Sequence, residues 1–575
     1  MNLRSQHTLN YKIYIIAYIT YCIIGIMVLR LMYLQISLTE RFTTRSQKNF
    51  LQIKTIQSPR GNIIDRYGRL LATNRPLTNL LWQGTGQYRL LPEQYDMLEK
   101  ISAIVNKPIT HDEELIKKIT HAERHRKQTL IATDLSLEQL SQIAEQFSST
   151  SNITISTHFK RHYPHHAFAS HLLGYLGTMG IDQYGKTGLE KLFEDTLKGE
   201  HGTEVNVIDS LGRNVTQTTL KEALCGNTIQ TTLDIDLQQL CENVFPADVC
   251  GTCIIMDPTD GALLAVLSRP NFDPTIFLEK IRDDVWQELQ KNNPFLNRAF
   301  NAMYPPGSIF KLITITAALE EHLIEQDATF NCKGFYTFGD HTHWCNRKSG
   351  HGKLTLNQAL AQSCNPPLYY IGAHMDIDTL ASYAYKFGLG KKTNTMFPEQ
   401  TGIVPNKSWK QEKKGERWWP GETLSVAIGQ SFLLATPIQI ARMISAIYTG
   451  YLVNTRILFN QPIEKQLLDI NQDTRKFLKK SMRRVVTSGT GKRLKYLKDI
   501  KVYAKTSTAQ TSALEKRNLS ADYWEHGWFA GNIVYKDHAP LTIVILVERA
   551  GSASVSTEIA KEFLIRYKKL MDGKV

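Results

Sequence analysis

Residues Tyr304–Leu312 read YPPGSIFKL: two prolines and a glycine precede a serine, and a lysine follows three positions later. Because proline and glycine stop any preceding helix, we expect Ser308 at a helix N-terminus, where backbone N–H groups and the helix dipole favour negative charge on its oxygen. Lys311 lies on the same face, and the apolar run after it would desolvate its amine and lower its pKa. The stretch therefore predicts a serine nucleophile with a lysine base. An isolated S-x-x-K is common by chance, however, as an N-cap serine beside a solvated lysine.

Two further segments change those odds. Ser363-Cys364-Asn365 follows a helical pattern and precedes two prolines, which puts a hydroxyl and a carboxamide at a helix break. Lys505 and Thr506 lie in AKTSTAQ, a strand pattern that can bind a carboxylate and pair with an extended peptide by strand addition. Each segment is weak by itself, but their order along the chain is a strong joint signal for one catalytic site.

The bulk composition indicates a globular protein of more than one domain. A chain of 575 residues is too long for one core, and 42% hydrophobic with 21% charged residues gives no sign of disorder. The net charge of +14 favours an anionic partner. Because the Lys and Arg residues are scattered rather than grouped in a stripe, we expect a membrane surface and no nucleic acid.

The N-terminus predicts a membrane anchor. Ile13–Leu29 carries no charge, lies between Lys12 and Arg30, and continues as a tyrosine-containing apolar segment to Ile36. Such a segment is long enough to cross a bilayer, and no signal-peptide cleavage site follows it. We therefore expect a cytoplasmic tail over residues 1–12 and one transmembrane helix over residues 13–35.

The rest of the chain divides into two parts. Residues 36–227 alternate short strands and helices, including one helix in YGKTGLEKLFEDTLKGEHG, and hold no cluster of nucleophile and base, so we expect a spacer or docking module. Residues 228–575 begin with a hairpin in GTCIIMDPTDGALLAVLS, continue with long helical runs and return to strands before a last helix. Strands at both ends of a helical block predict one α/β (α+β) unit whose sheet joins distant segments.

Motifs along nearly the whole chain recur in one known family. They are RGNIIDRYGRLLA, RHYPHHAFASHLLGYLG, GLEKLFEDTLKGEHG, TTLDIDLQQ, MDPTDGALLAVLSRPNFDP, YPPGSIFK, SCN, AIGQS, TPIQIA and KTSTAQ. With its single N-terminal anchor, the chain resembles the class B penicillin-binding proteins, which are peptidoglycan transpeptidases. GHG before SCN, WWPGET and HGWFAG resemble the elongation type more than the division type. The resemblance implies a serine β-lactamase/DD-transpeptidase-like domain, with an antiparallel sheet flanked by helices, after an elongated pedestal domain.

The resemblance also implies roles for individual residues. Ser308 would attack the penultimate D-Ala carbonyl of a stem pentapeptide, with Lys311 as the base and Ser363 as the proton relay to the leaving amine. The backbone N–H groups of Ser308 and Thr508 would form the oxyanion hole. The residues implied to bind substrate, through its amide, its terminal carboxylate and its oxyanion, are Asn365, Lys505, Thr506 and Thr508.

The same resemblance implies the partners and the location. The partners would be the D-Ala-D-Ala stem peptide, β-lactams as its mimics, the membrane, and a RodA-like polytopic glycan polymerase of the shape-elongation-division family. The protein would be a single-pass protein of the inner membrane with a periplasmic catalytic domain. The chemistry would require no cofactor.

One residue departs from the family pattern. The third motif usually ends in glycine, which lets the strand lie against substrate without a Cβ, but this chain has Ser507. We expect activity to persist, with the acylation rate and β-lactam sensitivity in question. The alternatives are a division-type transpeptidase, a catalytically weak scaffold, a β-lactamase, which would be about half as long with a cleavable leader, and a β-lactam-sensing receptor, which would have several membrane helices.

A possible second site lies among the cysteines. Cys332, Cys345, His351 and Cys364 follow the pattern C-x12-C-x5-H-x12-C, and three thiols with one imidazole match a structural zinc site in ligand type. The spacings alone favour a Cys332–Cys345 disulfide or three separate buried thiols. Some elongation-type relatives carry a metal at the matching place, however, so the resemblance implies zinc, and both interpretations stay open.

Other cysteines and histidines are expected to be structural. Cys250 and Cys253 form a C-x-x-C within an apolar strand, where small buried hydrophobes are expected rather than a redox pair. Four histidines in RHYPHHAFASH have no acidic or thiol partner nearby in the sequence, so we expect a solvated loop or a packed turn; they are His162, His165, His166 and His171.

Overall fold

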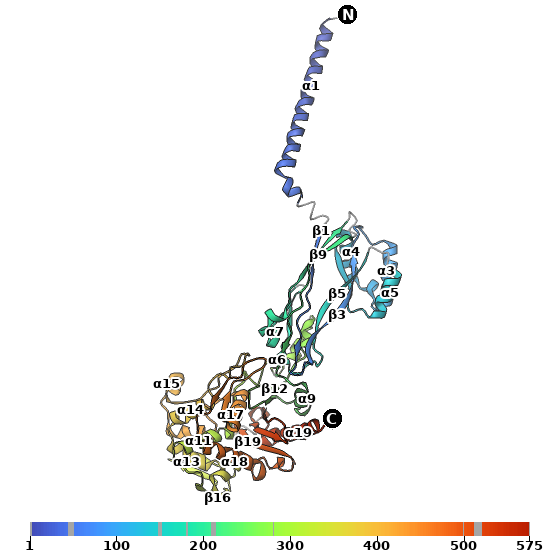
Figure 1. The fold of residues 1–575 in the computed structure, drawn as a ribbon. Helices are drawn as coiled ribbons and strands as arrows, with labels where there is room; N and C mark the ends of the chain where they lie inside the picture. Colours follow the sequence, from blue (N-terminus) through green and yellow to red (C-terminus); the bar gives the residue numbers. More distant parts are fainter. Residues whose placement is uncertain are drawn as a thin grey trace. The chain divides into compact units, whose positions relative to one another are not determined.

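A computed structural model of the chain forms two compact units (Figure 1). It describes residues 3–43, 51–147, 152–179, 182–208, 214–279, 281–291, 293–497, 499–510 and 520–573. Unit 1 comprises residues 1–59, 75–160 and 199–225, and unit 2 comprises residues 60–74, 161–198 and 226–575.

The N-terminal helix is apolar and fully exposed within unit 1. Helix α1 (Leu3–Met32) continues into a π-helical turn, Tyr33–Ser37. Its segment Ile13–Ser37 is 25 residues long with a mean hydropathy of 2.2, and none of its most apolar window is buried. A helix of this length and composition can cross a membrane, as the sequence predicts.

Besides α1, the described part of unit 1 combines small sheets with the helices α3, α4 and α5. One sheet has the antiparallel order β1 (Leu51–Ile56), β8 (Gly202–Ile208), β9 (Asn214–Lys221). The later residues of β3 (Leu70–Gln83) pair with β4 (Gln128–Ala132) and β5 (Ile153–His162). Three amphipathic helices bury their apolar faces in one core with residues of β3 and β4: α3 (Pro92–Val105), α4 (Glu113–His125) and α5 (Leu137–Phe147).

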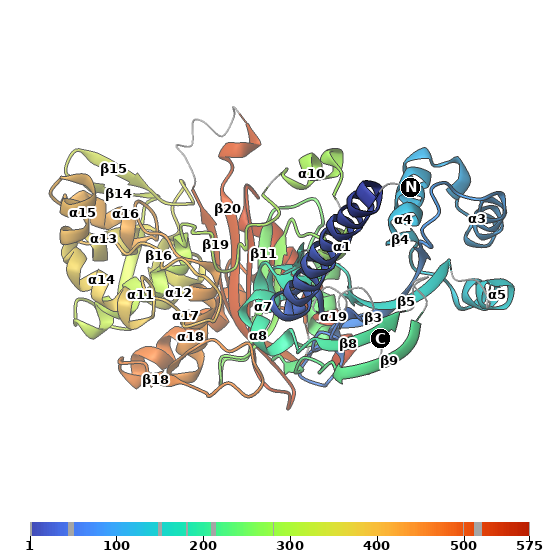
Figure 2. The same cartoon turned by 90° about the horizontal axis from the view of Figure 1, so that it is seen from above.

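Unit 2 is built on a five-stranded antiparallel sheet. Its strand order is β12 (Leu263–Arg269), β11 (Gly251–Met256), β21 (Leu541–Val547), β20 (His526–Tyr535), β19 (Ile500–Ala509). The strands thus come from both ends of the catalytic half, as predicted, and β19 lies at one edge (Figure 2).

Both faces of this sheet are buried, and successive residues of a strand enter different cores. In β21, Ile543 and Ile545 pack with α9 (Ile235–Val244) and α19 (Ala553–Met571), whereas Val544 and Leu546 join the larger core on the opposite face. Helix α17 (Pro437–Thr449) covers that opposite face by contacting β11, β20 and β21. The sheet is therefore packed on both faces, and its two edge strands are β12 and β19.

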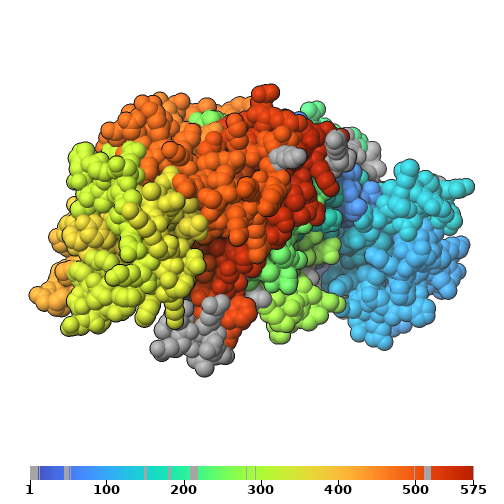
Figure 3. All heavy atoms as spheres, turned by 90° about the horizontal axis from the view of Figure 1, so that it is seen from below, coloured from blue at the N-terminus to red at the C-terminus, as the bar shows by residue number. Residues whose placement is uncertain are grey.

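The helical block between the strands carries the first two predicted motifs. Its helices are α10 (Asp283–Leu289), α11 (Lys311–Glu320), α12 (Leu356–Ala361), α13 (Pro366–His374), α14 (Ile377–Lys386), α15 (Lys407–Lys414), α16 (Pro420–Ala427), α17 and α18 (Gln472–Ser488). Short hairpins interrupt them: β13–β16 (Thr329–Cys332, Gly352–Thr355), β14–β15 (Phe335–Phe338, His341–Trp344) and β17–β18 (Tyr451–Val453, Lys465–Leu467). In Figure 3 the yellow-green segments near residue 350 lie beside orange and red segments from the C-terminal part of the chain.

The smaller elements of unit 2 precede the sheet or flank it. They are β2 (Ile63–Ile64), α6 (Ser170–Leu173), β6 (Leu176–Met179), β7 (Asp182–Gly185), α7 (Gly188–Leu192), α8 (Glu194–Leu197) and β10 (Ile229–Gln230).

The prediction of a single helix in YGKTGLEKLFEDTLKGEHG is wrong. The segment forms β7 and two short helices, α7 and α8. The helix is interrupted at Phe193 (φ −115°, ψ 30°). The interruption allows Glu190 and Glu194 to reach the same guanidinium, since each places a carboxylate oxygen 2.6 Å from Arg60. Glu190, with no exposed surface, also accepts from the buried Arg161 at 2.7 Å.

We predict that Glu190→Gln destabilises unit 2 by about 3–5 kcal/mol, because it leaves two buried guanidinium groups with too little negative charge. Thermal unfolding of the full chain in detergent measures the effect. The control is Glu113→Gln, which removes an ion pair to Lys117 whose side chains are 90% and 78% exposed and should change stability by less than about 1 kcal/mol. Equal melting temperatures for Glu190→Gln and the wild type would contradict the prediction.

Candidate active site

The first motif forms the start of a helix, as predicted. Ser308 lies in a 3-10 turn, Gly307–Ile309, that leads directly into α11, whose first residue is Lys311. Gly307 has a left-handed backbone (φ 52°) that reverses the chain before the serine. Ser308 and Lys311 are therefore one turn apart at the N-terminal end of a helix whose side chains are almost all buried.

The second motif forms the break between α12 and α13. Ser363 has a left-handed backbone (φ 56°), which is uncommon for a residue with a side chain, and Pro366 begins the next helix. The N–H of Cys364 caps α12 by donating to the carbonyl of Ala359 at 2.8 Å. This reversal turns the Ser363 side chain toward α11.

Ser363 is the point where the three motifs meet. Its hydroxyl donates to Oγ of Ser308 at 2.8 Å, and it accepts from Nζ of Lys505 at 3.1 Å and from Nζ of Lys311 at 3.4 Å. In the described part of the chain, no direct hydrogen bond joins Lys311 to the Ser308 hydroxyl. The connection between nucleophile and amine in this state therefore runs through Ser363.

Both lysines have no exposed surface. Nζ of Lys311 donates to the Ser363 carbonyl at 2.8 Å and to Oδ1 of Asn365 at 2.7 Å. Burial lowers the pKa of Lys311 to about 8, although the nearby thiols of Cys364 and Cys345 oppose this change. Burial, and then repulsion from Lys311, lowers the pKa of Lys505 well below its usual range. An amine with a pKa near neutrality can accept a proton.

The third motif lies on β19, one of the two edge strands of the sheet. Lys505 donates to the carbonyl of Thr506 at 2.8 Å, and Oγ1 of Thr506 is 2.6 Å from Oγ1 of Thr490. Thr508 is exposed, and its hydroxyl accepts from the N–H of Ala553 at 3.0 Å. An edge strand beside the nucleophile can accept an extended peptide as a further strand.

Ser507 faces the turn that carries the nucleophile. Its side chain is 2% exposed, and its Oγ accepts the backbone N–H of Ser308 at 2.7 Å. The residue that departs from the family pattern thus contacts the start of the catalytic helix directly.

Asn365 lies on the opposite wall from β19. Its Nδ2 donates to the Trp344 carbonyl at 3.1 Å, and the hydroxyl of Tyr369 donates to the same carbonyl at 3.2 Å. Asn365 is only partly buried, so its carboxamide is held in place and remains accessible.

These walls enclose a cavity of about 800 Å³. The predicted residues that line it are Ser308, Ser363, Asn365, Thr506, Ser507 and Thr508. Lys311 and Lys505 lie behind this surface and reach it through Ser363. The structure therefore brings all seven predicted catalytic and substrate-binding residues together.

Three residues of this site were not found from the sequence. Thr490 follows α18 and contacts Thr506, whereas Trp344 and Tyr369 hold Asn365. Thr490 belongs to SGTG, an ordinary helix-ending turn, and Trp344 contributes only its backbone carbonyl. No sequence pattern marks either contact.

The predicted cysteine–histidine set also forms one cluster. One ligand atom from each of Cys332, Cys345, His351 and Cys364 lies within 4.8 Å of all the others, and the three cysteines are buried. The two sulfurs of Cys345 and Cys364 are 3.9 Å apart, and Nδ1 of His351 is 3.7 Å from Cys332 and 3.5 Å from Cys345. Sulfurs bound to one tetrahedral zinc ion at about 2.3 Å would be about 3.8 Å apart. All of these cysteines are free thiols, so the alternative disulfide is not formed.

The remaining cysteine prediction agrees with the structure, but the histidine prediction agrees only in part. His165 and His166 lie in a turn, whereas His162 ends strand β5 and His171 lies in helix α6. Cys253 is buried in β11 with its sulfur 3.6 Å from Cys241, not beside Cys250. Nε2 of His171, in α6, donates to the Pro294 carbonyl at 2.7 Å, and burial lowers the pKa of His171 to about 4. His166 lies 3.1 Å from Asp273 at the surface.

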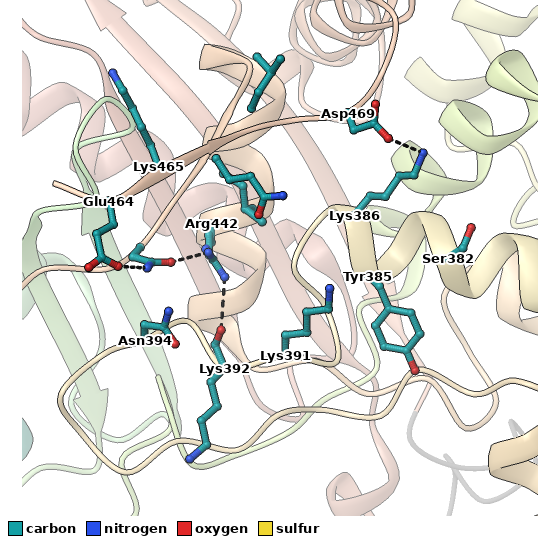
Figure 4. Close-up of a pocket in the computed structure, with 14 residues that line it drawn as sticks. Ser382, Tyr385, Lys386, Lys391, Lys392, Asn394, Arg442, Glu464, Lys465 and Asp469 are labelled. Atoms are coloured by element: carbon teal, nitrogen blue, oxygen red, sulfur yellow. Dashed lines mark hydrogen bonds and ion pairs between the residues drawn. The ribbon is translucent and has the colours of Figure 1, made fainter.

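A separate cavity of about 790 Å³ lies among α14, α17 and the β17–β18 hairpin (Figure 4). It is lined by several cationic side chains, and Arg442 donates to the Val453 carbonyl at 2.6 Å and to Oδ1 of Asn454 at 2.6 Å. None of the residues from the three motifs lines it. It is therefore distinct from the candidate site.

Comparison with known proteins agrees with this geometry. Residues 251–564 match the family "Penicillin binding protein transpeptidase domain", and residues 55–231 match "Penicillin-binding Protein dimerisation domain". A similar curated protein is "Peptidoglycan D,D-transpeptidase MrdA" of Haemophilus influenzae, 29% identical over 92% of this chain and 87% of that protein.

Two solved structures resemble the chain as a whole. One is the complex between penicillin-binding protein (PBP2) and MreC from Helicobacter pylori, with 28% identity, a TM-score of 0.75 and coverage of 91% of this chain and 99% of that chain. Another, described as structural coordination of polymerization and crosslinking by a peptidoglycan synthase complex, has 28% identity, a TM-score of 0.76 and coverage of 97% and 98%.

Proposed function

The chain belongs to the penicillin-binding protein transpeptidase family, and we propose that it is an elongation-type peptidoglycan D,D-transpeptidase whose nucleophile is Ser308. The observation that carries the assignment of residues is the convergence of Ser308, Lys311 and Lys505 on the hydroxyl of Ser363. The similarity to MrdA and to elongation-type structures favours assignment to the elongation type over the division type.

In the acylation step, Oγ of Ser308 attacks the carbonyl carbon of the penultimate D-Ala. The Ser308 proton passes through Ser363 to the neutral amine of Lys311, since the Ser363 hydroxyl is hydrogen-bonded to both Ser308 and Lys311. The same path then returns a proton to the amine of the terminal D-Ala as its C–N bond breaks. An amine from a neighbouring stem attacks the resulting ester, forms the cross-link and releases Ser308.

The cavity walls position the donor peptide for this attack. The stem peptide lies along the edge of β19, with its terminal carboxylate at Thr506 and the charge of Lys505 behind it. The carboxamide of Asn365 binds the peptide amide from the opposite wall. The backbone N–H groups of Ser308 and Thr508 bind the oxyanion. β-Lactams acylate Ser308 as mimics of D-Ala-D-Ala.

A structural zinc ion held by Cys332, Cys345, His351 and Cys364 is part of the proposal. Support comes from the ligand types and from spacings between ligand atoms that suit a tetrahedral ion. Cys364 lies between Ser363 and Asn365, and Cys345 follows Trp344, whose carbonyl holds Asn365. The metal would therefore brace the wall that carries the second motif and would take no part in the chemistry.

We also propose the domain organisation and partners on this basis. Residues 36–227 form the pedestal and residues 228–575 the transpeptidase domain, with residues 13–35 as the inner-membrane anchor, residues 1–12 in the cytoplasm and the catalytic domain in the periplasm. Because one similar structure belongs to a complex that couples polymerization to crosslinking, the proposed partner is a RodA-like glycan polymerase. Its copurification with the full chain, lost when residues 36–227 are exchanged, would test this.

We predict that Ser308→Ala abolishes covalent labelling by a fluorescent penicillin, because the label forms an ester with this hydroxyl. Labelling of the full chain in detergent is read on a denaturing gel. Ser554→Ala, a serine that lines the same cavity without contacting Lys311 or Lys505, is the control and should label normally. Persistent wild-type label identifies a transpeptidase, rapid loss a β-lactamase, and no label a scaffold.

A second prediction concerns the proton path. Ser363→Ala should slow acylation by about 10²- to 10⁴-fold, the usual contribution of a positioned proton-transfer group. The acylation rate constant is measured by stopped-flow with the same penicillin, and the melting temperature is measured in parallel. A rate within threefold of the wild type would show that Lys311 takes the proton without Ser363.

A third prediction concerns the metal. The purified full chain should contain about one zinc ion, and Cys345→Ser should lose it and melt at a lower temperature, because a structural zinc site contributes directly to folding. Elemental analysis measures the metal. Cys225→Ser, a change at an exposed cysteine, is the control. A wild type without zinc, or full zinc retention by Cys345→Ser, would overturn the assignment.

A further inference from the structure

The hydroxyl of Ser507 accepts a hydrogen bond from the backbone N–H of Ser308, a donor that the proposed reaction needs. The backbone N–H of Ser308 points at Oγ of Ser507, and the two atoms are 2.7 Å apart. This is a short distance for an N–H···O bond, whose mode is about 2.9–3.0 Å. The same N–H is one of the two groups proposed above to bind the oxyanion, so in this state that donor is already satisfied.

The surroundings hold the hydroxyl in this position. Ser507 is 2% exposed and lies on the same face of β19 as the buried Lys505. A Cβ added to Gly307 would lie 2.4 Å from Oγ of Ser507, so the hydroxyl fills the space beside the left-handed glycine that precedes the nucleophile. The contact thus joins the edge strand to the turn that carries Ser308.

The Ser507 hydroxyl can also leave this position by a change of side-chain rotamer. Ser507 lines the 800 Å³ cavity, and a serine side chain can occupy three staggered positions. A rotation about Cα–Cβ carries Oγ away from the Ser308 N–H without moving β19. The N–H then becomes free to bind an oxygen in the cavity.

We propose that Ser507 is a positioning residue that closes the oxyanion hole in the resting protein and must rotate away before acylation. This inference rests on the proposed function. An oxyanion needs its donors about 2.7–3.1 Å away at the moment of attack, and one N–H cannot make two such short bonds. The acyl donor therefore has to displace the Ser507 hydroxyl, which slows acylation by any ligand that binds the cavity.

The expected size of the effect follows from the contact that is broken. A neutral hydrogen bond inside a protein typically contributes enough to change an equilibrium by roughly three- to tenfold. Removing the hydroxyl should therefore raise the acylation rate constant by roughly three- to tenfold. The dissociation constant of the non-covalent complex should change little, because the oxyanion forms only during attack.

The test compares three variants of the full chain in detergent. Ser507→Ala removes the hydroxyl but keeps Cβ, Ser507→Gly removes both, and Ser507→Thr keeps the hydroxyl. Stopped-flow labelling with a fluorescent penicillin separates the dissociation constant from the acylation step, in which the Ser308 Oγ–carbon bond forms, the lactam C–N bond opens and the ring nitrogen takes the proton. We expect faster acylation in Ser507→Ala and Ser507→Gly but not in Ser507→Thr.

An independent measurement uses an arylboronic acid, which forms a tetrahedral adduct on a serine with an oxygen in the oxyanion position. Its affinity should rise by the same factor in Ser507→Ala and Ser507→Gly. A purely structural role of Ser507 would alter the melting temperature without this rise. Ser382→Ala, at a serine that lines the separate cavity of Figure 4, serves as the control.

Several outcomes would overturn the inference while leaving the proposed function intact, because the wild type would still be labelled at Ser308. If only Ser507→Gly accelerates acylation, Cβ is the obstruction and the hydroxyl has no gating role. If both Ser507→Ala and Ser507→Gly slow acylation, the hydroxyl donates to the oxyanion itself. If neither changes the rate, the contact is irrelevant. No label in the wild type or in any Ser507 variant would overturn both proposals.

Discussion

The site depends on two lysine side chains that have no exposed surface and no carboxylate partner in the part of the chain that the structure describes. Burying an ammonium group is costly unless its donors are satisfied, and a lowered pKa is the usual response. Lys311 and Lys505 share the Ser363 hydroxyl and otherwise donate to backbone carbonyls and a carboxamide. Because all of these acceptors are neutral, burial lowers the pKa of both amines, and repulsion from Lys311 lowers the pKa of Lys505 further.

The fold brings these groups together from three distant segments. Helix α11 carries Lys311, the break before α13 carries Ser363, and edge strand β19 carries Lys505. The sheet is packed on both faces, which holds its edge strand beside the turn that leads into α11. Side chains of β19 complete the buried cluster, because Lys505 contacts Ser363 and Ser507 contacts Ser308.

The sequence was sufficient for the parts of this arrangement that depend on local chemistry. Pro306 and Gly307 predicted the helix start at Ser308, and the turn in MDPTDG predicted the β11–β12 hairpin. The bonds among Ser308, Ser363 and Lys505 could not be predicted from local pattern, since they join residues 55 and 142 positions apart. The interruption at Phe193 was missed for the same reason: it depends on Arg60, which is 130 positions away from its partner Glu190. Likewise, the sequence identified the serine at position 507 as a departure from the family pattern. Only the structure shows that its hydroxyl accepts a hydrogen bond from the Ser308 N–H.

The left-handed backbone of Ser363 explains how the second motif contacts both Lys311 and Ser308. With φ at 56°, the chain reverses so that the carbonyls of Ser363 and Cys364 and the side chain of Asn365 all lie within 3.4 Å of Nζ of Lys311, while the Ser363 hydroxyl faces Ser308. A left-handed conformation costs a residue with a Cβ about 1–2 kcal/mol, so the surrounding structure has to hold it. The cap onto α12 holds the backbone on one side, and the Cys364 thiol, packed against Cys345, holds it on the other. The position of the Ser363 hydroxyl, and with it the proposed proton path, therefore depends on contacts made by groups that take no part in proton transfer themselves.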